Sequence, residues 1–117
     1  MQRIMLKSKI HRATLTATDL HYEGSITIDG KLLRAADILP GEQVHVLNLN
    51  NGSRLITYAI EGPDDSGVML LNGPAARAGM AGDIIVVITY VNVDDKELPN
   101  YKPKVLKVDE KNRIIEN

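Results

Sequence analysis

The sequence contains no cysteine, phenylalanine or tryptophan, and four tyrosines are all that it has of the large aromatic residues. Without cysteine there can be no disulfide bond, no thiolate nucleophile and no cysteine-ligated metal. The shortage of aromatic rings argues against a stacking platform for single-stranded nucleic acid. The core of the folded protein must therefore consist of aliphatic side chains.

An excess of charge of either sign is also missing. Lysine and arginine total 14 and aspartate and glutamate total 15, which gives a formal net charge of -1. A general binder of nucleic acid would carry a clear basic excess, so the composition argues against that class.

Long apolar runs are absent as well. No window reaches the roughly 18 uninterrupted apolar residues that a membrane helix needs. Charges near the N-terminus lie too close together for the apolar centre of a signal peptide. We therefore expect a cytoplasmic protein with no membrane partner.

The residues that are present favour strands. The chain has 117 residues, enough for one domain, and isoleucine, valine and threonine together number 27. These β-branched side chains are typical of pleated, half-buried surfaces. The composition thus predicts a single, mainly β domain spanning residues 1–117.

Periodicity and turn residues divide the chain into short elements. From the N-terminus, we expect a strand over 3–18, an extended segment over 21–28, a helix over 29–39, and strands over 43–49 and 54–60 joined by a turn at 50–53. Next we expect a short strand over 68–71, a turn or short helix at 72–77, and an apolar strand over 84–93 with both faces covered. The chain then ends with an edge strand over 105–108 and a loose tail at about 109–117.

Taken one by one, the chemically interesting residues have unremarkable interpretations. The three histidines form no close pair, and no acidic cluster has metal-ligand spacing, so we expect no metal site. A β-bulge at Gly24-Ser25 is favoured over a reactive bond, because glycine in a strand often marks a bulge. Lys9 and His11 share one side of a strand, and Arg54 follows a turn as an ordinary strand-end cation.

The combination is more specific than its parts. Five separated motifs occur in order: Lys9-Ile10-His11-Arg12, then Asp19-Leu20-His21-Tyr22-Glu23-Gly24-Ser25, then Asn51-Gly52-Ser53-Arg54 with Thr57-Tyr58-Ala59-Ile60, then Asn72-Gly73-Pro74-Ala75-Ala76-Arg77, and finally Gly82-Asp83-Ile84. In this arrangement the chain closely resembles the aspartate 1-decarboxylase family, over essentially its whole length and less clearly after Asp94.

The resemblance implies a fold and a cofactor. The family is a six-stranded double-psi β-barrel with short helices, and it assembles as a homotetramer with active sites shared between subunits. Its precursor cleaves itself, which here means between Gly24 and Ser25, giving a β chain of residues 1–24 and an α chain of residues 25–117. Ser25 then becomes a covalent, self-generated pyruvoyl group, which forms a Schiff base with L-aspartate and leads to β-alanine and CO₂ for pantothenate and coenzyme A biosynthesis.

The resemblance also assigns roles. It makes Ser25 the pyruvoyl residue, Gly24 the cleavage site, Thr57 a processing residue and Tyr58 the proton donor. The remaining residues that it places around the substrate are Lys9, His11, Tyr22, Arg54, Asn72, Gly73, Ala75 and Ala76.

Two features of the sequence qualify the resemblance. The family usually has alanine where this chain has Pro74, which donates no N–H, so we expect a stiffened loop with activity retained. Thr57 and Tyr58 are neighbours, so in a regular strand their side chains point to opposite faces. Either the strand bulges or twists there, or one site collects groups from two subunits.

Two other functions are compatible with such a barrel. One is a non-enzymatic double-psi barrel that binds peptide or nucleic acid, because fold alone does not fix function. The other is a decarboxylase that uses the same pyruvoyl device on another amino acid. The resemblance leaves open a maturation helper protein.

Overall fold

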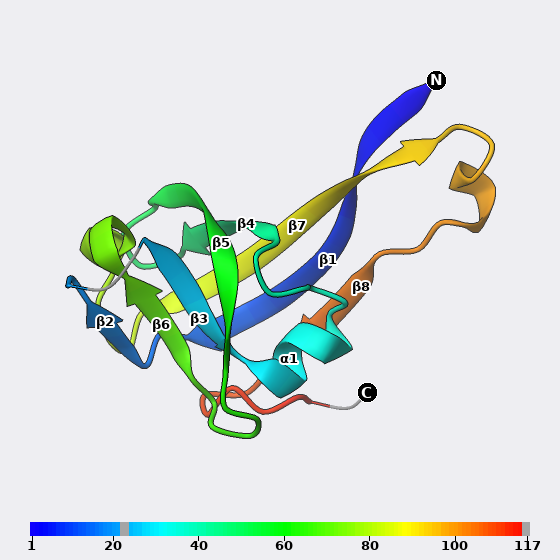
Figure 1. Ribbon diagram of the computed structural model, residues 1–117. Helices are drawn as coiled ribbons and strands as arrows, with labels where there is room; N and C mark the ends of the chain where they lie inside the picture. The colour runs from blue at the N-terminus through cyan, green and yellow to red at the C-terminus, as the bar shows by residue number, and fades with distance from the viewer. Residues whose placement is uncertain (22–23, 116–117) are drawn as a thin grey trace.

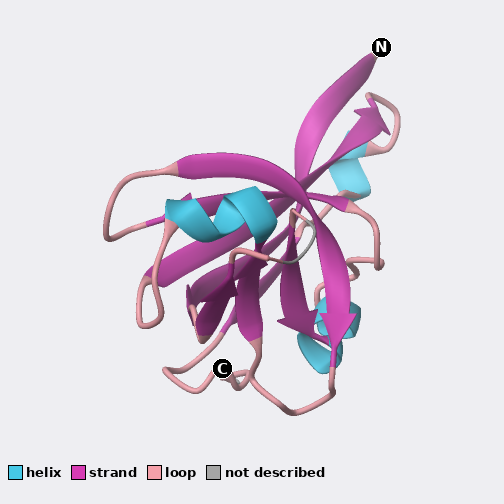
Figure 2. Ribbon diagram, turned by 60° about the vertical axis from the view of Figure 1, so that its left-hand side comes forward, coloured by secondary structure: helices cyan, strands magenta, loops and turns pink. Residues whose placement is uncertain are grey.

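The computed structural model of the chain describes residues 1–21 and 24–115 (Figure 1). Over these residues the protein is mainly β, with eight strands in one mixed sheet and three short helical segments at its margins (Figure 2). The predicted fold class, mainly β with short helices, is confirmed.

The elements follow one another in short steps. In chain order they are β1 (Gln2–Thr14), β2 (Ala17–Asp19), β3 (Ser25–Asp29), α1 (Gly30–Ala35), β4 (Gln43–Asn48), β5 (Arg54–Gly62), β6 (Met69–Asn72), the 3₁₀ helix η1 (Gly73–Ala78), β7 (Ile84–Asp94), the 3₁₀ helix η2 (Leu98–Asn100) and β8 (Lys104–Lys107).

The strand order makes the sheet curl. Hydrogen bonding gives the order β2-β6-β3-β5-β4-β7-β1-β8, so β1 and β2 lie near opposite ends. They are nevertheless joined by only Leu15 and Thr16. Thr16 N–H donates to the carbonyl of Met69 at 2.9 Å, and Leu15 N–H donates to that of Asp83 at 2.8 Å. The two ends of the sheet therefore meet, as in a barrel, although β2 and β8 do not pair.

The sheet has eight strands where the resemblance implied six, partly because the predicted strand over 3–18 is divided. Register shifts interrupt the pairing of β1 with β7, one of them between Ile10 and Ala13, where Arg12 takes a φ of 61°. Such a bulge bends the strand and strengthens its twist. Thr16 Oγ1 then donates to the carbonyl of Met69 and accepts the Met69 N–H, and β2 begins there in a new direction.

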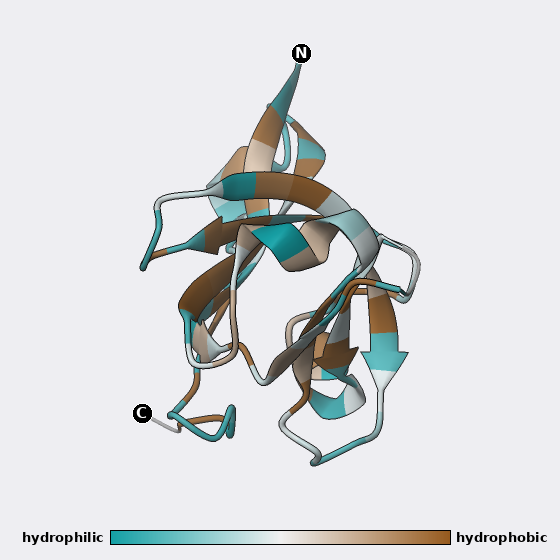
Figure 3. Ribbon diagram, turned by 90° about the vertical axis from the view of Figure 1, so that its left-hand side faces the viewer, coloured by the Kyte–Doolittle hydropathy of each residue, from teal (hydrophilic) through white to brown (hydrophobic). Residues whose placement is uncertain are grey.

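The sheet has a core face and an outer face around the β5-β4-β7-β1 strands. Side by side across the core face lie Leu55, Val46, Val87 and Ile10, the last three almost fully buried. Figure 3 shows the brown apolar segments concentrated on the strands and teal polar segments at loops and termini. Burying each such side chain stabilises the fold by about 1.5–3 kcal/mol. As predicted, the core is aliphatic.

Helix α1 is shorter than the predicted segment over 29–39. It begins where the Asp29 carboxylate accepts the Lys31 N–H at 2.9 Å, an N-cap bond. It ends because Asp37 has a φ of 58° and Ile38 N–H returns to the carbonyl of Leu33. Backbone reversal at Asp37 therefore stops the helix before Pro40 is reached.

Three further predictions concern the 50–53 turn, the edge strand over 105–108 and the apolar strand over 84–93. The 50–53 turn joins antiparallel β4 and β5, with Gly52 at a φ of 75°, as its sequence predicts. The edge strand is present as β8, parallel to β1. In β7, residues Ile85 to Thr89 are covered on both faces, but Tyr90 is 40% exposed, so that prediction fails beyond Thr89.

The expected loose tail is wrong for residues 109–115. Asn112 is 1% exposed, and its amide donates to the carbonyls of Thr14 and Gly67 while its oxygen accepts the Thr14 N–H. Val108 pairs with Ile114, which packs against the core. These contacts fasten the segment across the end of β1.

Candidate active site

Ser25 lies at the first position of β3 and is completely buried. Its Oγ accepts a hydrogen bond from Nδ2 of Asn72 at 2.9 Å. The same Nδ2 donates to Oγ1 of Thr27, also at 2.9 Å, and Asn72 is 1% exposed. Ser25 and Asn72 are direct partners across β3 and β6, so sheet register places them together. The serine hydroxyl is thus held in a dry, polar cluster.

The carbonyl of Gly24, one peptide before, faces Thr57 on the other side of β3. Thr57 Oγ1 donates to this oxygen at 3.4 Å, a long hydrogen bond. Parallel pairing of β3 with β5, in which Ile26 is opposite Ala59, brings Thr57 alongside Gly24. A donor therefore lies beside the carbonyl that precedes the buried hydroxyl.

Thr57 and Tyr58 do point to opposite faces. The pairing of β5 with β4 runs without interruption from Arg54 opposite Leu47 to Tyr58 opposite Gln43, so this stretch holds no bulge. Thr57 belongs to the core face, opposite the fully buried Val44. Arg54 and Tyr58 therefore share the outer face. Of the two explanations, a bulged strand is excluded for this part of β5.

Lys9 lies on the same outer face as Arg54 and Tyr58. Pairing across four strand borders sets one row there: Ile56 on β5, His45 on β4, Ile88 on β7, Lys9 on β1 and Val105 on β8. Ile56 is 59% exposed although it is apolar. The outer face combines cations with an uncovered apolar surface.

His11 follows Lys9 on this face and pairs with Lys107 of β8. It lines a cavity of about 420 Å³ together with Arg12 and Thr14. Burial, reinforced by the nearby cations of Lys9, Arg12 and Lys107, lowers the pKa of His11 below its ordinary value of 6.5. The structure thus places Lys9 and His11 in a different part of the sheet from the Ser25 cluster.

The remaining predicted substrate contacts lie in η1, directly after Asn72. Gly73 is buried, whereas Ala75 and Ala76 are half-buried. Asn72 occupies the N-cap position but makes no side-chain cap bond, and its Nδ2 donates to Ser25 and Thr27. Tyr22 lies outside the described residues.

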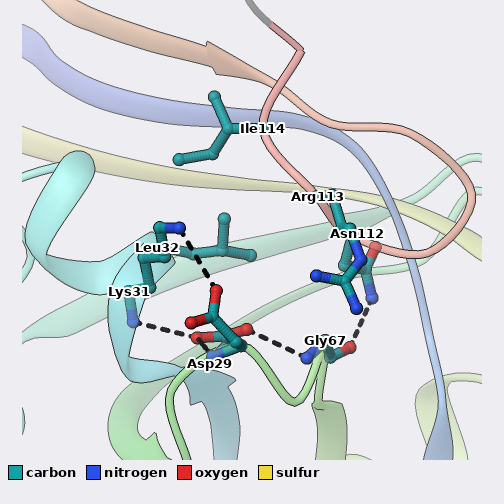
Figure 4. Close-up of a pocket in the computed structure, with 8 residues that line it drawn as sticks. Asp29, Lys31, Leu32, Gly67, Asn112, Arg113 and Ile114 are labelled. Atoms are coloured by element: carbon teal, nitrogen blue, oxygen red, sulfur yellow. Dashed lines mark hydrogen bonds and ion pairs between the residues drawn. The ribbon is translucent and has the colours of Figure 1, made fainter.

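Three further cavities among the described residues are lined by none of the predicted catalytic residues. Figure 4 shows one of about 300 Å³ beside α1, where Asp29 accepts the N–H of Gly67 and Asn112 contacts the Gly67 carbonyl. Its polar groups bond to one another and stabilise the loop. Within residues 1–21 and 24–115, no group of three or more histidine or acidic side chains could hold a metal ion. None of the helices in that part of the chain is long and apolar enough to cross a membrane.

Two residues of the site were not singled out in the sequence. Thr27 supports the Asn72 amide, and its position two residues after Ser25 on one strand could have indicated a shared face. His45 lies in the middle of the outer-face row, its ring packing edge-on against Tyr90 at 5.0 Å. Only the strand order reveals His45, because its neighbours are distant in sequence.

The arrangement defines a class of protein: a barrel-like β fold with a desolvated serine hydroxyl beside a glycine carbonyl and an adjacent donor. In chemical terms, such a hydroxyl can attack the carbonyl of the preceding peptide bond.

Comparison with known proteins identifies the family. The family model described as aspartate decarboxylase matches residues 1–115. Aspartate 1-decarboxylase of Thermoanaerobacter pseudethanolicus is 59% identical over 115 residues, covering 98% of each chain. The protein of that name from Syntrophobacter fumaroxidans is 58% identical and covers 98% of this chain and 93% of its own, and that from Myxococcus xanthus is 52% identical, covering 98% and 88%.

The chain therefore belongs to the aspartate decarboxylase family and is an enzyme, a lyase of the decarboxylase type. The resemblance noted in the sequence is confirmed, and the non-enzymatic alternative is set aside.

Proposed function

We propose that the protein decarboxylates L-aspartate to β-alanine and CO₂, using a pyruvoyl group made from Ser25 after self-cleavage at the Gly24–Ser25 bond. The observation that carries this proposal is the buried Ser25 hydroxyl, bonded to Asn72, next to a Gly24 carbonyl that faces Thr57. The names of the family and of its relatives supply the substrate.

The cleavage can be written with every bond accounted for. Ser25 Oγ attacks the Gly24 carbonyl carbon, the peptide C–N bond breaks, and an ester and a free amine result. Loss of the Ser25 α-proton then expels Gly24 as a carboxylate and leaves dehydroalanine. Its imine tautomer takes up water and releases ammonia, which leaves the pyruvoyl carbonyl.

The surrounding residues suit the first of these steps. The attacked carbonyl develops negative charge, which a preorganised donor stabilises far better in a dry site than in water. Thr57 lies beside that oxygen, and its 3.4 Å contact shortens if the oxygen moves toward it as the carbonyl becomes tetrahedral. Asn72 fixes Ser25 Oγ from the other side.

The residues also fit the group that cleavage would leave. A pyruvoyl ketone at position 25 would be built on the former Cα, with Cβ as its methyl group, because Oγ leaves with Gly24. The Asn72 amide, which bonds the side chain at this position, is a hydrogen-bond donor suited to an oxygen acceptor there. When present, that carbonyl supplies the electrophile that takes up the substrate amine and the electron pair left by CO₂.

The predicted substrate contacts are cations and a tyrosine on the outer face, together with backbone N–H groups near Ser25. Arg54 presents a fork of donors matched to a carboxylate, and Lys9 a second positive charge, so the outer face suits a dianion. Tyr58 carries a hydroxyl proton on the same face, for delivery to the substrate Cα. Ala75 and Ala76 offer backbone N–H groups near Ser25, with Gly73 beside them, and His11 extends the cationic side of the site.

These contacts favour a site assembled from two copies of the chain. Within one copy, Thr57 faces the Ser25 cluster while Arg54 and Tyr58 face away from it on a regular strand. A second copy that docks its Ser25 end against the exposed outer face would unite the two halves and cover Ile56. A homotetramer with shared sites, as the family resemblance implies, belongs to this proposal.

The product gives the enzyme its place in metabolism. β-Alanine formation serves pantothenate and coenzyme A biosynthesis in the family, and we propose the same role in the cytoplasm here. A maturation helper protein is compatible with the scheme, because the long Thr57 contact, at 3.4 Å, stabilises the Gly24 carbonyl only weakly before cleavage.

Mass spectrometry of the purified protein tests the proposal directly. We expect one fragment that ends at Gly24 and a second that begins with pyruvoyl in place of Ser25, together with CO₂ release from aspartate. Ser25→Ala should abolish both. An intact chain that releases no CO₂ would refute the proposal, and release from glutamate instead would refute the substrate.

A further inference from the structure

Pro74 lies beside Gly24, the residue before the bond proposed to break. A Cβ added to Gly24 would be 3.3 Å from Cδ and 4.0 Å from Cγ of Pro74, so the proline ring packs beside the glycine. The two residues come from different elements, Gly24 from the bend before β3 and Pro74 from the first turn of η1. Their contact is decided by tertiary structure alone.

The position of the Pro74 ring is fixed by the ring itself and by the two residues before it. The pyrrolidine ring fixes the φ angle of Pro74. The preceding Gly73 takes a φ of 60° and is buried, a conformation that residues with a side chain adopt only with strain. Asn72, before it, is anchored through Ser25 and Thr27. The loop therefore cannot yield easily toward solvent.

Gly24, in contrast, has a backbone that can rotate widely, because it lacks a Cβ. Its carbonyl must remain directed at Thr57 for attack by the neighbouring hydroxyl, and a hydrogen bond of 3.4 Å is a weak restraint on that direction. A rigid surface on the opposite side removes some of the unproductive rotations. Reduced rotational freedom of the reacting group increases the rate of an intramolecular attack.

We propose that Pro74 is a positioning residue for self-cleavage, which holds Gly24 with its carbonyl toward Thr57. This inference rests on the proposed function, since it concerns the rate of the same cleavage. An alanine at this position, as the family resemblance implies, would have an N–H where Pro74 has Cδ.

The first test compares Pro74→Ala with Pro99→Ala. Pro99 is a matched control because it occupies the equivalent position of η2, another 3₁₀ helix. We expect Pro74→Ala to slow the appearance of cleaved chains about tenfold, equivalent to about 1.4 kcal/mol, and Pro99→Ala to leave it unchanged. Activity per pyruvoyl group, counted by mass spectrometry, should stay the same in both variants.

A double-mutant cycle distinguishes positioning from a general loss of structure. Gly24→Ala should slow cleavage strongly beside Pro74, because the new Cβ would press on Cδ, but much less in the Pro74→Ala background. We expect a coupling of at least about threefold between the two substitutions. Additive effects, or a cleavage rate in Pro74→Ala equal to or faster than that of the natural chain, would overturn the proposal.

A second readout does not depend on cleavage. Crystal structures of Ser25→Ala and of Ser25→Ala/Pro74→Ala should show Gly24 O turned away from Thr57 only in the double variant. An unchanged contact would refute positioning by Pro74. If the natural chain is never cleaved, the proposed function fails, while these two structures still decide the role of Pro74.

Discussion

The most informative experiment concerns the two faces of β5. Thr57 faces the Ser25 cluster, while Tyr58 faces outward with Arg54, and no register break in this part of β5 could turn Tyr58 inward. If one site needs Ser25 from one copy and Tyr58 from another, two inactive variants can repair each other. The variants are Ser25→Ala and Tyr58→Phe, each of which keeps the backbone and removes one oxygen.

The expected activity of the mixture follows from the fraction of sites in which both groups are intact. In oligomers assembled at random from equal amounts, half of the outer faces carry Tyr58 and half of the Ser25 ends carry Ser25. About one quarter of the sites then receive both intact groups. Either variant alone has a defect in every site, so its activity provides the baseline.

The assay is CO₂ release from aspartate by co-expressed, differently tagged variants purified through both tags. Thermal melting and size measurement show that each variant folds and assembles, which is expected because Ser25→Ala only removes an acceptor of the Asn72 bond. Activity near one quarter of the natural level supports the shared site. Baseline activity in correctly assembled mixtures would show that Ser25 and Tyr58 act within one chain and would refute the argument from strand faces.

Three further predictions concern stability and processing. Asn112→Ala removes three buried hydrogen bonds and should lower the free energy of unfolding in urea by about 3 kcal/mol; Asn112→Gly should lose about 1 kcal/mol less, because glycine suits its φ of 60°. Thr27→Val removes one acceptor of the Asn72 amide and should slow cleavage by about tenfold, whereas Thr27→Ser should not; equal rates in gel time courses would contradict the role of this hydroxyl. The lowered pKa of His11 means that the unfolded chain binds its proton first as pH falls through 6.5, so the natural protein should lose stability there relative to His11→Gln, and parallel unfolding curves from pH 8 to 5 would disprove this.

Local sequence predicted the elements whose causes are local. The Asn50-Asn51-Gly52 turn fixes a hairpin because the backbone reversal that it needs suits those residues. Alternation predicted β4, the hairpin turn predicted β5 and a continuous apolar run predicted β7, each end to within two residues. The helix over 29–39 was predicted too long, because its end depends on the reversed backbone at Asp37 rather than on Pro40.

The tail shows where local reasoning stops. Residues 109–113 are all polar, which favoured a loose tail, yet Asn112 bonds to Thr14 and Gly67, which are far away in the chain. Polarity indicates solvent exposure only when no distant backbone group needs a partner. A buried asparagine that satisfies the backbone of a distant strand and of a distant loop cannot be recognised from its neighbours in sequence.

The sequence by itself determined the composition of the core, the class of fold and, through its motifs, the family and the list of candidate residues. Only the tertiary structure decided how those residues group: Ser25 with Asn72, Thr27 and Thr57, Lys9 with Arg54 and Tyr58 on the outer face, and Pro74 against Gly24. The physical reason is that side-chain type and periodicity act over a few residues, whereas strand order and register bring together groups that are tens of residues apart. The candidate residues were visible in the sequence, but which of their atoms meet within one chain, and hence the proposal that two copies join them, depended on the sheet.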